Sequence, residues 1–98
     1  MSEYVLTQAA KGDLLKILEY LEGDNPSAVL KVVDARDDAM QLLADNPAIG
    51  RLRSDLTPQD VRFWSVFRHL VIYRPDTKPL EIVRVLHGKR NVRRLLEE

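Results

Sequence analysis

Three strand-length apolar runs lie close together in the second half of the chain, and they constrain its fold more than any other feature. They cover residues 61–66, 69–74 and 80–86 and are rich in β-branched and aromatic residues. The two links between them, residues 67–68 and 75–79, are too short for the crossover that parallel neighbours require. The sequence therefore predicts an antiparallel meander over this half of the chain.

The first half of the chain predicts a short strand followed by a helix. Residues 3–7 have the pattern of a short strand, and Thr7 is placed to cap the helix that follows. Gly23 is placed to end that helix. Its apolar stripe consists of Ala10, Leu14, Ile17, Leu18 and Leu21.

A second helix is predicted after the junction Asp24-Asn25-Pro26. Asn25 suits an N-cap and Pro26 suits the first helical position, and we expect the helix to run to about Ala44. Two helices joined by so short a link form an antiparallel hairpin. The apolar side of the second helix contains Val29, Val33, Met40 and Leu43, and its solvent side is predicted to contain Asp34, Arg36, Asp37, Asp38 and Gln41.

This order of elements predicts an α+β fold in a single domain, residues 1–98. The hairpin must bury its apolar stripes, and one face of the sheet is the only large apolar surface available. We expect an N-terminal strand, a helical hairpin packed on a small, mainly antiparallel twisted sheet, and a short C-terminal helix from Asn91. The face of the last strand that meets the helices stays open. Ile82, Arg84 and Leu86 lie on one side of that strand, Val83 and Val85 lie on the other, and both sides are mostly apolar.

Composition narrows the class of protein. The absence of cysteine excludes disulfides, cysteine nucleophiles and thiolate metal sites. The apolar runs are too short to span a membrane, and the N-terminus lacks the pattern of a signal peptide. We therefore expect a cytoplasmic protein that has no membrane segment, and we expect neither a metal nor another cofactor.

Charge is distributed unevenly although the net charge is zero. Residues 1–48 hold four Lys/Arg and nine Asp/Glu, whereas residues 49–98 hold eleven and six. The densest basic stretch, residues 84–94, contains five Lys/Arg and no acid. This asymmetry indicates a basic working surface or a partner that recognises both signs. Ordinary scatter of surface charge and a solvated chain end are the alternatives.

The sequence resembles the RelE/ParE superfamily of bacterial toxins from type II toxin–antitoxin systems over nearly its whole length. The order and spacing of several segments carry this resemblance, and no single motif is specific. The segments are Y-V-L-T-x-x-A-x-x-D-L-x-x-I-x-x-Y-L at 4–21, Asn25-Pro26, N-P-A-I-G-R-L-R at 46–53, L-V-I-Y-R-P at 70–75, and I-V-R-V-L-H-G-K-R at 82–90.

The resemblance implies one of two activities. RelE-like members cut messenger RNA on the ribosome, whereas ParE-like members act on DNA gyrase without nuclease chemistry. RelE-like toxins place an arginine on the middle strand where this chain has Leu70, and a tyrosine near the end where it has Leu96. Of the three expected nuclease groups only Arg90 is matched, so the resemblance favours the ParE-like branch.

The resemblance also implies two surfaces and two partners, DNA gyrase and a ParD-like cognate antitoxin. Operator DNA is a further expected ligand of the toxin–antitoxin complex. The expected target-binding surface contains Arg84, His87, Lys89, Arg90, Arg93 and Arg94. The expected antitoxin-binding surface contains Leu14, Leu18, Leu21, Val29 and Trp64.

Two other function classes remain as alternatives. A RelE-like endoribonuclease would use Arg84, His87 and Arg90, because histidine can act as acid or base near neutral pH. A small nucleic-acid-binding module is disfavoured, since neutralising phosphates requires a basic excess that this chain lacks.

Two adjacent aromatic residues bear on the expected surfaces. Phe63 and Trp64 must point to opposite faces of their strand. We expect Trp64 to enter the core and Phe63 to be covered by the tail. An aromatic side chain left exposed here would be a candidate for an interface.

Overall fold

A computed structural model describes residues 3–24, 26–53, 55, 57–66, 69–87 and 94, with only the backbone described from 21 to 32. The predicted order of elements is confirmed, and the strand at 69–74 has the predicted bounds. The elements are β1 (Tyr4–Leu6), α1 (Gln8–Asp24), α2 (Pro26–Asp45), β2 (Arg62–Val66), β3 (His69–Arg74) and β4 (Leu80–His87). Pro26 opens α2 as predicted, whereas α1 continues through Gly23 to Asp24. The predicted C-terminal helix lies outside the described residues except for Arg94, which is helical.

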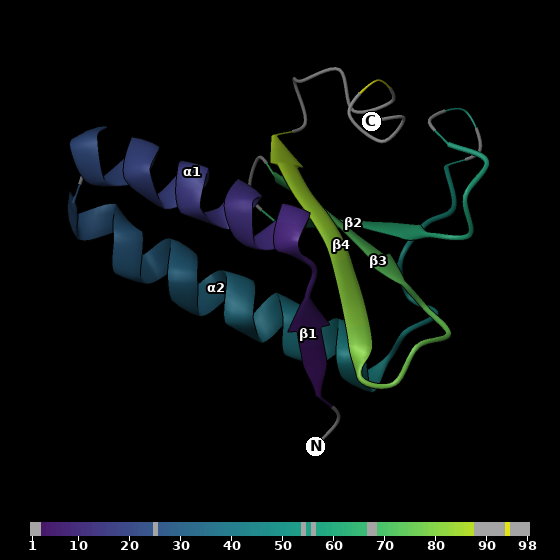
Figure 1. Cartoon of the computed structure of the whole chain (residues 1–98). Coiled ribbons are helices and arrows are strands. Elements are labelled where there is room, and N and C mark those ends of the chain that lie inside the picture. The colour runs from purple at the N-terminus through teal and green to yellow at the C-terminus, as the bar shows by residue number, and fades with distance from the viewer. Residues whose placement is uncertain are drawn as a thin grey trace.

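The four strands form one mixed sheet in the order β1-β4-β3-β2. β2 pairs with β3 and β3 with β4 in antiparallel fashion, so the predicted meander is confirmed. β1 pairs parallel to β4, with the helical hairpin supplying the crossover. Figure 1 shows both helices side by side on one face of the sheet, which confirms the predicted α+β class. Neither helix, as far as it is described, is long and apolar enough to cross a membrane.

The main core lies between the helices and the sheet. Ala10 and Leu14 of α1 and Met40 and Leu43 of α2 are buried here, as the apolar stripes predict. They pack on a face of the sheet that contributes Val71, Tyr73, Leu80, Ile82 and Val85. Trp64 is half-buried and packs against this cluster, in agreement with its predicted direction.

A smaller core covers the opposite face of the sheet. Val61, Phe63, Ile72 and Leu86 are buried together, with Leu70 and Val83 packed against them. Phe63 therefore points away from the helices and is buried, as expected. The tail that we expected to cover Phe63 lies outside the described residues.

A β-bulge in β4 decides which residues of this strand face the helices. Ile72 pairs with Arg84 but Tyr73 pairs with Ile82, so Val83 is an extra residue in β4. Ile82 packs in the main core and Val83 against the smaller one. Beyond the bulge the alternation restarts, so that Val85 again packs against the helices. Both sides of the strand look apolar in the sequence because the strand changes phase in its middle.

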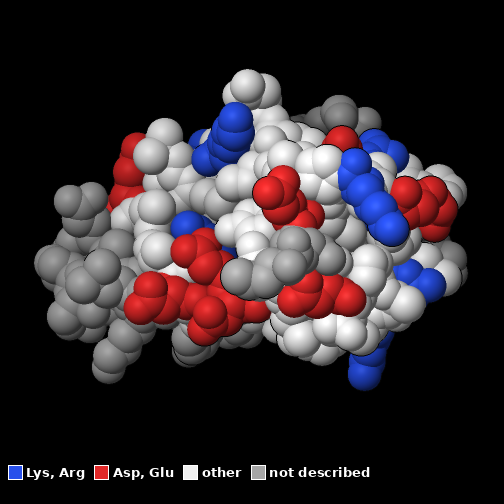
Figure 2. All heavy atoms as spheres, turned by 90° about the horizontal axis from the view of Figure 1, so that it is seen from below, with Lys and Arg blue, Asp and Glu red and all other residues white. Residues whose placement is uncertain are grey.

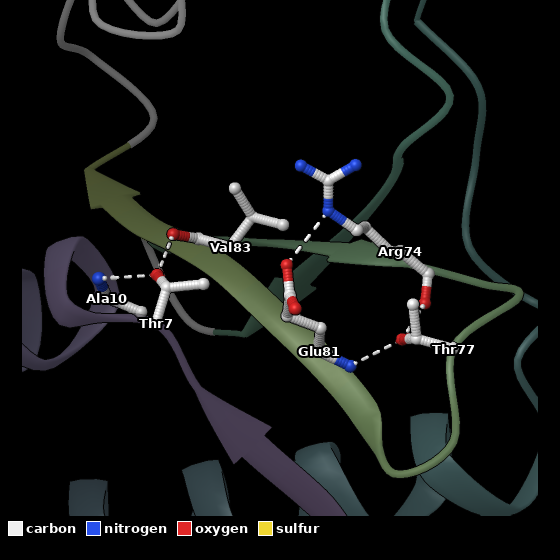
Figure 3. Close-up of polar contacts among 6 residues, drawn as sticks. All are labelled: Thr7, Ala10, Arg74, Thr77, Glu81 and Val83. Carbon is white, nitrogen blue, oxygen red and sulfur yellow. Dashed lines mark hydrogen bonds and ion pairs between the residues drawn. The ribbon is translucent and has the colours of Figure 1, made fainter.

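Side chains at the start of α1 form hydrogen bonds with backbone groups of β4 beyond the point where the short strand β1 ends. The Thr7 hydroxyl donates to the Val83 carbonyl at 2.7 Å and accepts the Ala10 amide at 3.1 Å (Figure 3). The Asp13 carboxylate accepts the Val85 amide at 3.0 Å. Thr7 caps α1 as predicted, and together these two side chains take the place of strand partners along β4.

The loop after α2 is fastened to the sheet through Tyr73. The buried Tyr73 hydroxyl donates to the Pro47 carbonyl at 2.7 Å and accepts the Gly50 amide at 2.9 Å. Arg62 adds a bond to the Gly50 carbonyl at 2.8 Å. These contacts fix the path by which the chain enters the sheet at Arg51, which forms an isolated bridge to Phe63.

Candidate functional site

Arg84, a predicted target-binding residue, is held inside the protein by Asp13 of α1. Its Nε and Nη2 atoms donate to the two carboxylate oxygens at 2.8 and 2.9 Å. The Asp13 side chain is only 6% exposed. This bidentate pair joins α1 to β4, and it aligns the carboxylate that also accepts the Val85 amide.

His87, the next predicted residue, lies beside His69 at the far end of the sheet. The two residues pair across β3 and β4, and their ring centroids are 5.6 Å apart in an edge-to-face arrangement. The pKa of His69 is lowered, first by burial and then by the charges of His87 and Arg36. Arg84 contacts Asp13, and His87 lies beside His69.

The rest of the expected target-binding surface is described only at one position. Arg94 is exposed and helical. Lys89, Arg90 and Arg93 lie outside the described residues.

The predicted antitoxin-binding residues divide between the core and the surface. Leu14 is buried in the main core, while Leu18 and Trp64 are half-buried. The side chains of Leu21 and Val29 lie outside the described residues. The structure adds two exposed apolar side chains on α1 that the sequence did not single out, Leu15 and Tyr20, which are 59% and 75% exposed.

A small hollow, here called the inner hollow, lies between the helices and the end of the sheet that carries the two histidines. Its volume is about 10 Å³, which is room for roughly one water-sized group. Arg36 and His69 are its polar residues. Its lining consists of Leu14, Ile17, Arg36, Val66, His69, Val71 and Val85.

The position of Arg36 differs from the prediction. The pattern of charges places it on the solvent side of α2, but it is half-buried and lines the inner hollow. It precedes the buried Met40 and Leu43 by four and seven residues, so it occupies the core-facing stripe of the helix. This spacing alone places Arg36 on the buried side of the helix, whereas the neighbouring aspartates favour the solvent side.

The outward face of α2 is acidic. Asp34, Asp37, Asp38 and Asp45 are exposed along it. Figure 2 shows acidic side chains gathered over this side of the molecule. Asp37 accepts a hydrogen bond from the Tyr4 hydroxyl at 3.2 Å. Burial, and after it the neighbouring Asp37 carboxylate, raises the pKa of Tyr4.

A larger hollow, here called the outer cavity, opens beside β2 and has a volume of about 350 Å³. Two arginines that the sequence analysis did not single out, Arg51 and Arg53, border it. Its lining consists of Arg51, Arg53, Phe63, Trp64, Ser65 and Leu70. The only signal for it in the sequence is the R-L-R pattern just ahead of the first strand of the meander.

The outer cavity has the chemistry of an anion-binding surface. Arginine stays protonated and offers several donors in a planar fork, so Arg51 and Arg53 suit carboxylates or phosphates. The described lining contains no histidine, carboxylate, lysine or tyrosine that could transfer a proton. Arg53 already pairs with the exposed Asp55 at 2.8 Å, which raises the pKa of its guanidinium further. Within the described part of the chain, no group of three or more metal-ligating side chains gathers.

Comparison with known proteins agrees with the observed fold. The family described as "ParE toxin of type II toxin-antitoxin system, parDE" matches residues 4–92. In structure the chain is similar to a protein described as "Chromosomal ParDE TA system from P. aeruginosa", with a TM-score of 0.74. That match has 22% sequence identity and covers 91% of this chain and 98% of the other, so it shows the fold alone. No curated protein matched the chain in sequence. Since the family match spans most of its length and agrees with the resemblance noted in its sequence, the chain belongs to the ParE toxin family of type II toxin–antitoxin systems.

Proposed function

We propose that this toxin acts by binding DNA gyrase and that a ParD-like cognate antitoxin neutralises it. The observation that supports binding over catalysis is the lining of the outer cavity. It offers Arg51 and Arg53 for charge and shape recognition, and Leu70 stands where the nuclease branch has an arginine.

The chemistry of RNA cleavage supplies the physical reason. Cleavage requires a base for the 2′-hydroxyl, an acid for the leaving oxygen and cations for the developing charge. Among the described residues, the lining of the outer cavity offers only the cations. His69 lies elsewhere, in the lining of the inner hollow beside Arg36. The next residue on the strand, Leu70, points to the opposite face of the sheet.

Neutralisation is supported by apolar surface on the helical hairpin. Leu15 on α1 is 59% exposed, and the half-buried Leu18 lies on the same face of the helix, three residues further on. An antitoxin segment that covers these two side chains would bury apolar area and stabilise the toxin by mass action.

The proposal is tested by a supercoiling assay with purified gyrase, run beside a translation extract in which messenger RNA is monitored. The wild type should inhibit supercoiling and leave the message intact, and saturating antitoxin should restore supercoiling. The double variant R51Q/R53Q should inhibit at least about tenfold less, since each lost charged hydrogen bond costs about 1.5–3 kcal/mol. R74Q is the matched control, because Arg74 is an exposed arginine outside the cavity lining. Ribosome-dependent cleavage of message without inhibition of supercoiling would reject the proposal in favour of the nuclease.

A further inference from the structure

Arg36 breaks the local rule for the helix that carries it. It lies in the core-facing stripe of α2, one turn before Met40, at a position where an apolar side chain would pack against the sheet. Departures of this kind, where a polar side chain replaces a packing residue, are concentrated at functional sites. The guanidinium of Arg36 therefore requires an explanation beyond folding.

Two of the three guanidinium nitrogens of Arg36 are buried without an acceptor among the described residues. Its Nε and Nη1 atoms are inaccessible to solvent and meet no hydrogen-bond partner among the described residues. A buried donor left in this state costs about 1–3 kcal/mol, and more when the group is charged. Such a group in a native structure requires an explanation, and an acceptor supplied by another molecule is one of them.

The carboxylates close to Arg36 in the sequence, and Asp13 on the facing helix, have other partners or point to other faces of the helix. Asp37 accepts a hydrogen bond from Tyr4, and Asp13 is fixed by Arg84 and the Val85 amide. Asp34 and Asp38 are two residues away on the helix and so point to other faces. No described carboxylate forms an ion pair with Arg36.

The surroundings of Arg36 form a small site that lacks only an anion. The inner hollow has room for roughly one water-sized group, such as one carboxylate oxygen with its partner at the rim. His69 supplies a second donor beside the guanidinium, and His87 lies behind His69. The remaining walls are apolar side chains of α1, β2, β3 and β4. A charge-assisted hydrogen bond is strong in such surroundings.

We propose that Arg36 and His69 bind one carboxylate of the antitoxin, from an aspartate or glutamate side chain that enters the inner hollow. This assignment rests on the proposed neutralisation by an antitoxin and names the chemistry of one contact within it. Arg36 supplies the fixed charge. His69 adds a donor whose charge depends on pH.

The proposal carries a dependence on pH with a definite sign. In the free toxin, burial, His87 and Arg36 all oppose protonation of His69, and no described carboxylate in the hollow favours it. A bound carboxylate would favour the protonated form. Because this coupling is reciprocal, the antitoxin should bind more tightly as the pH falls from 8 to 6.

The first test uses the purified toxin and its cognate antitoxin in calorimetric titrations. R36M should raise the melting temperature of the free toxin, because methionine fills the apolar stripe and leaves no buried donor. The same variant should weaken antitoxin binding roughly 10- to 100-fold, the value of a hydrogen-bonded charge. R36K should lie between R36M and the wild type, and R74Q, an exposed arginine outside the hollow, should bind as the wild type does.

The second test concerns His69 and the antitoxin side of the contact. H69Q should bind with an affinity that no longer rises between pH 8 and pH 6. The acidic residues of the antitoxin are replaced one at a time by their amides. For one of them, the loss of binding free energy should not add to the loss caused by R36M.

The outcomes separate the site from the wider proposal. If the wild-type toxin does not bind the antitoxin, neutralisation and this site are both rejected. If the wild type binds, and R36M binds equally well at every pH, only the carboxylate site is rejected. The carboxylate site is also rejected if every acidic substitution of the antitoxin weakens binding to R36M as much as it weakens binding to the wild-type toxin.

Discussion

Asp13 on α1 and Arg84 on β4, 71 residues apart in sequence, form a bidentate ion pair with distances of 2.8 and 2.9 Å. The carboxylate is nearly buried and also accepts the amide of Val85. This pair connects the hairpin to the last strand just beyond the bulge, where none of the described strands pairs with the backbone of β4 on that side. The ion pair therefore stabilises the fold.

Removing one partner of this pair should be costly. R84A leaves the Asp13 carboxylate buried without its cation, so the free energy of unfolding should fall by about 3–5 kcal/mol. Urea unfolding followed by circular dichroism measures the change. R74A is the matched control, because Arg74 pairs with Glu81 at 2.9 Å on the surface (Figure 3) and should cost no more than about 1 kcal/mol. Similar losses in the two variants would contradict the structural role of Asp13 and Arg84.

Gly50 should not tolerate even one added methyl group. A Cβ atom there would lie 2.8 Å from Cε1 of Tyr73, which is fully buried and cannot move aside easily. G50A should lower the free energy of unfolding by about 1–3 kcal/mol, as overpacking usually does. The control is G12A in α1, where an added Cβ meets nothing within 4 Å and should stabilise the helix by about 0.5–1 kcal/mol. Chemical denaturation of both variants measures these changes. If G50A is as stable as the wild type, the loop is not held by Tyr73 as described.

The hydroxyl of Tyr73 should stabilise the protein through the loop that it holds. Y73F leaves the Pro47 carbonyl and the Gly50 amide without their partner, at a cost of about 1–3 kcal/mol. Amide hydrogen exchange at Gly50 should accelerate in this variant. Unchanged exchange at Gly50, with the rest of the protein intact, would contradict the contact.

Thr7 should contribute more than an ordinary helix cap. Its hydroxyl serves both the Ala10 amide and the Val83 carbonyl, so T7V should destabilise the protein by about 1–3 kcal/mol while keeping the volume of the side chain. T7S retains the hydroxyl and is the matched control. Thermal unfolding of both variants tests this, and an equal loss in T7S would assign the effect to the methyl group.

His69 should make the stability of the free toxin depend on pH. Its pKa in the folded state lies below the usual value of about 6.5, so the unfolded chain binds the proton first as the pH falls. The contribution of His69 is therefore fully present above about pH 6.5. It is lost as the pH falls through the folded pKa. Urea unfolding between pH 8 and pH 5 should show a smaller loss in H69Q than in the wild type, and identical profiles would show that protonation of His69 is not coupled to folding.

The sequence by itself determined the elements, their order and the family. The three apolar runs with short links left no alternative to a meander, and the stripes of α1 and α2 required a sheet face to cover them. Thr7 and Pro26 marked the helix starts, because capping chemistry is local. The buried positions Leu14, Met40 and Leu43 followed from helical spacing alone.

Only the tertiary structure decided the faces and the sites. The bulge at Val83 shifts which residues of β4 face the helices. Alternation counted along the sequence cannot predict this shift, because the extra residue is evident only from the pairing with β3. Arg36 was assigned to solvent by its charge, whereas the hollow beside it is made by four other elements. The resemblance placed Arg84 on the target-binding surface, and only the tertiary structure shows that it pairs with Asp13 of α1. Charge is a local property of the chain, but its role depends on which distant groups folding brings to it.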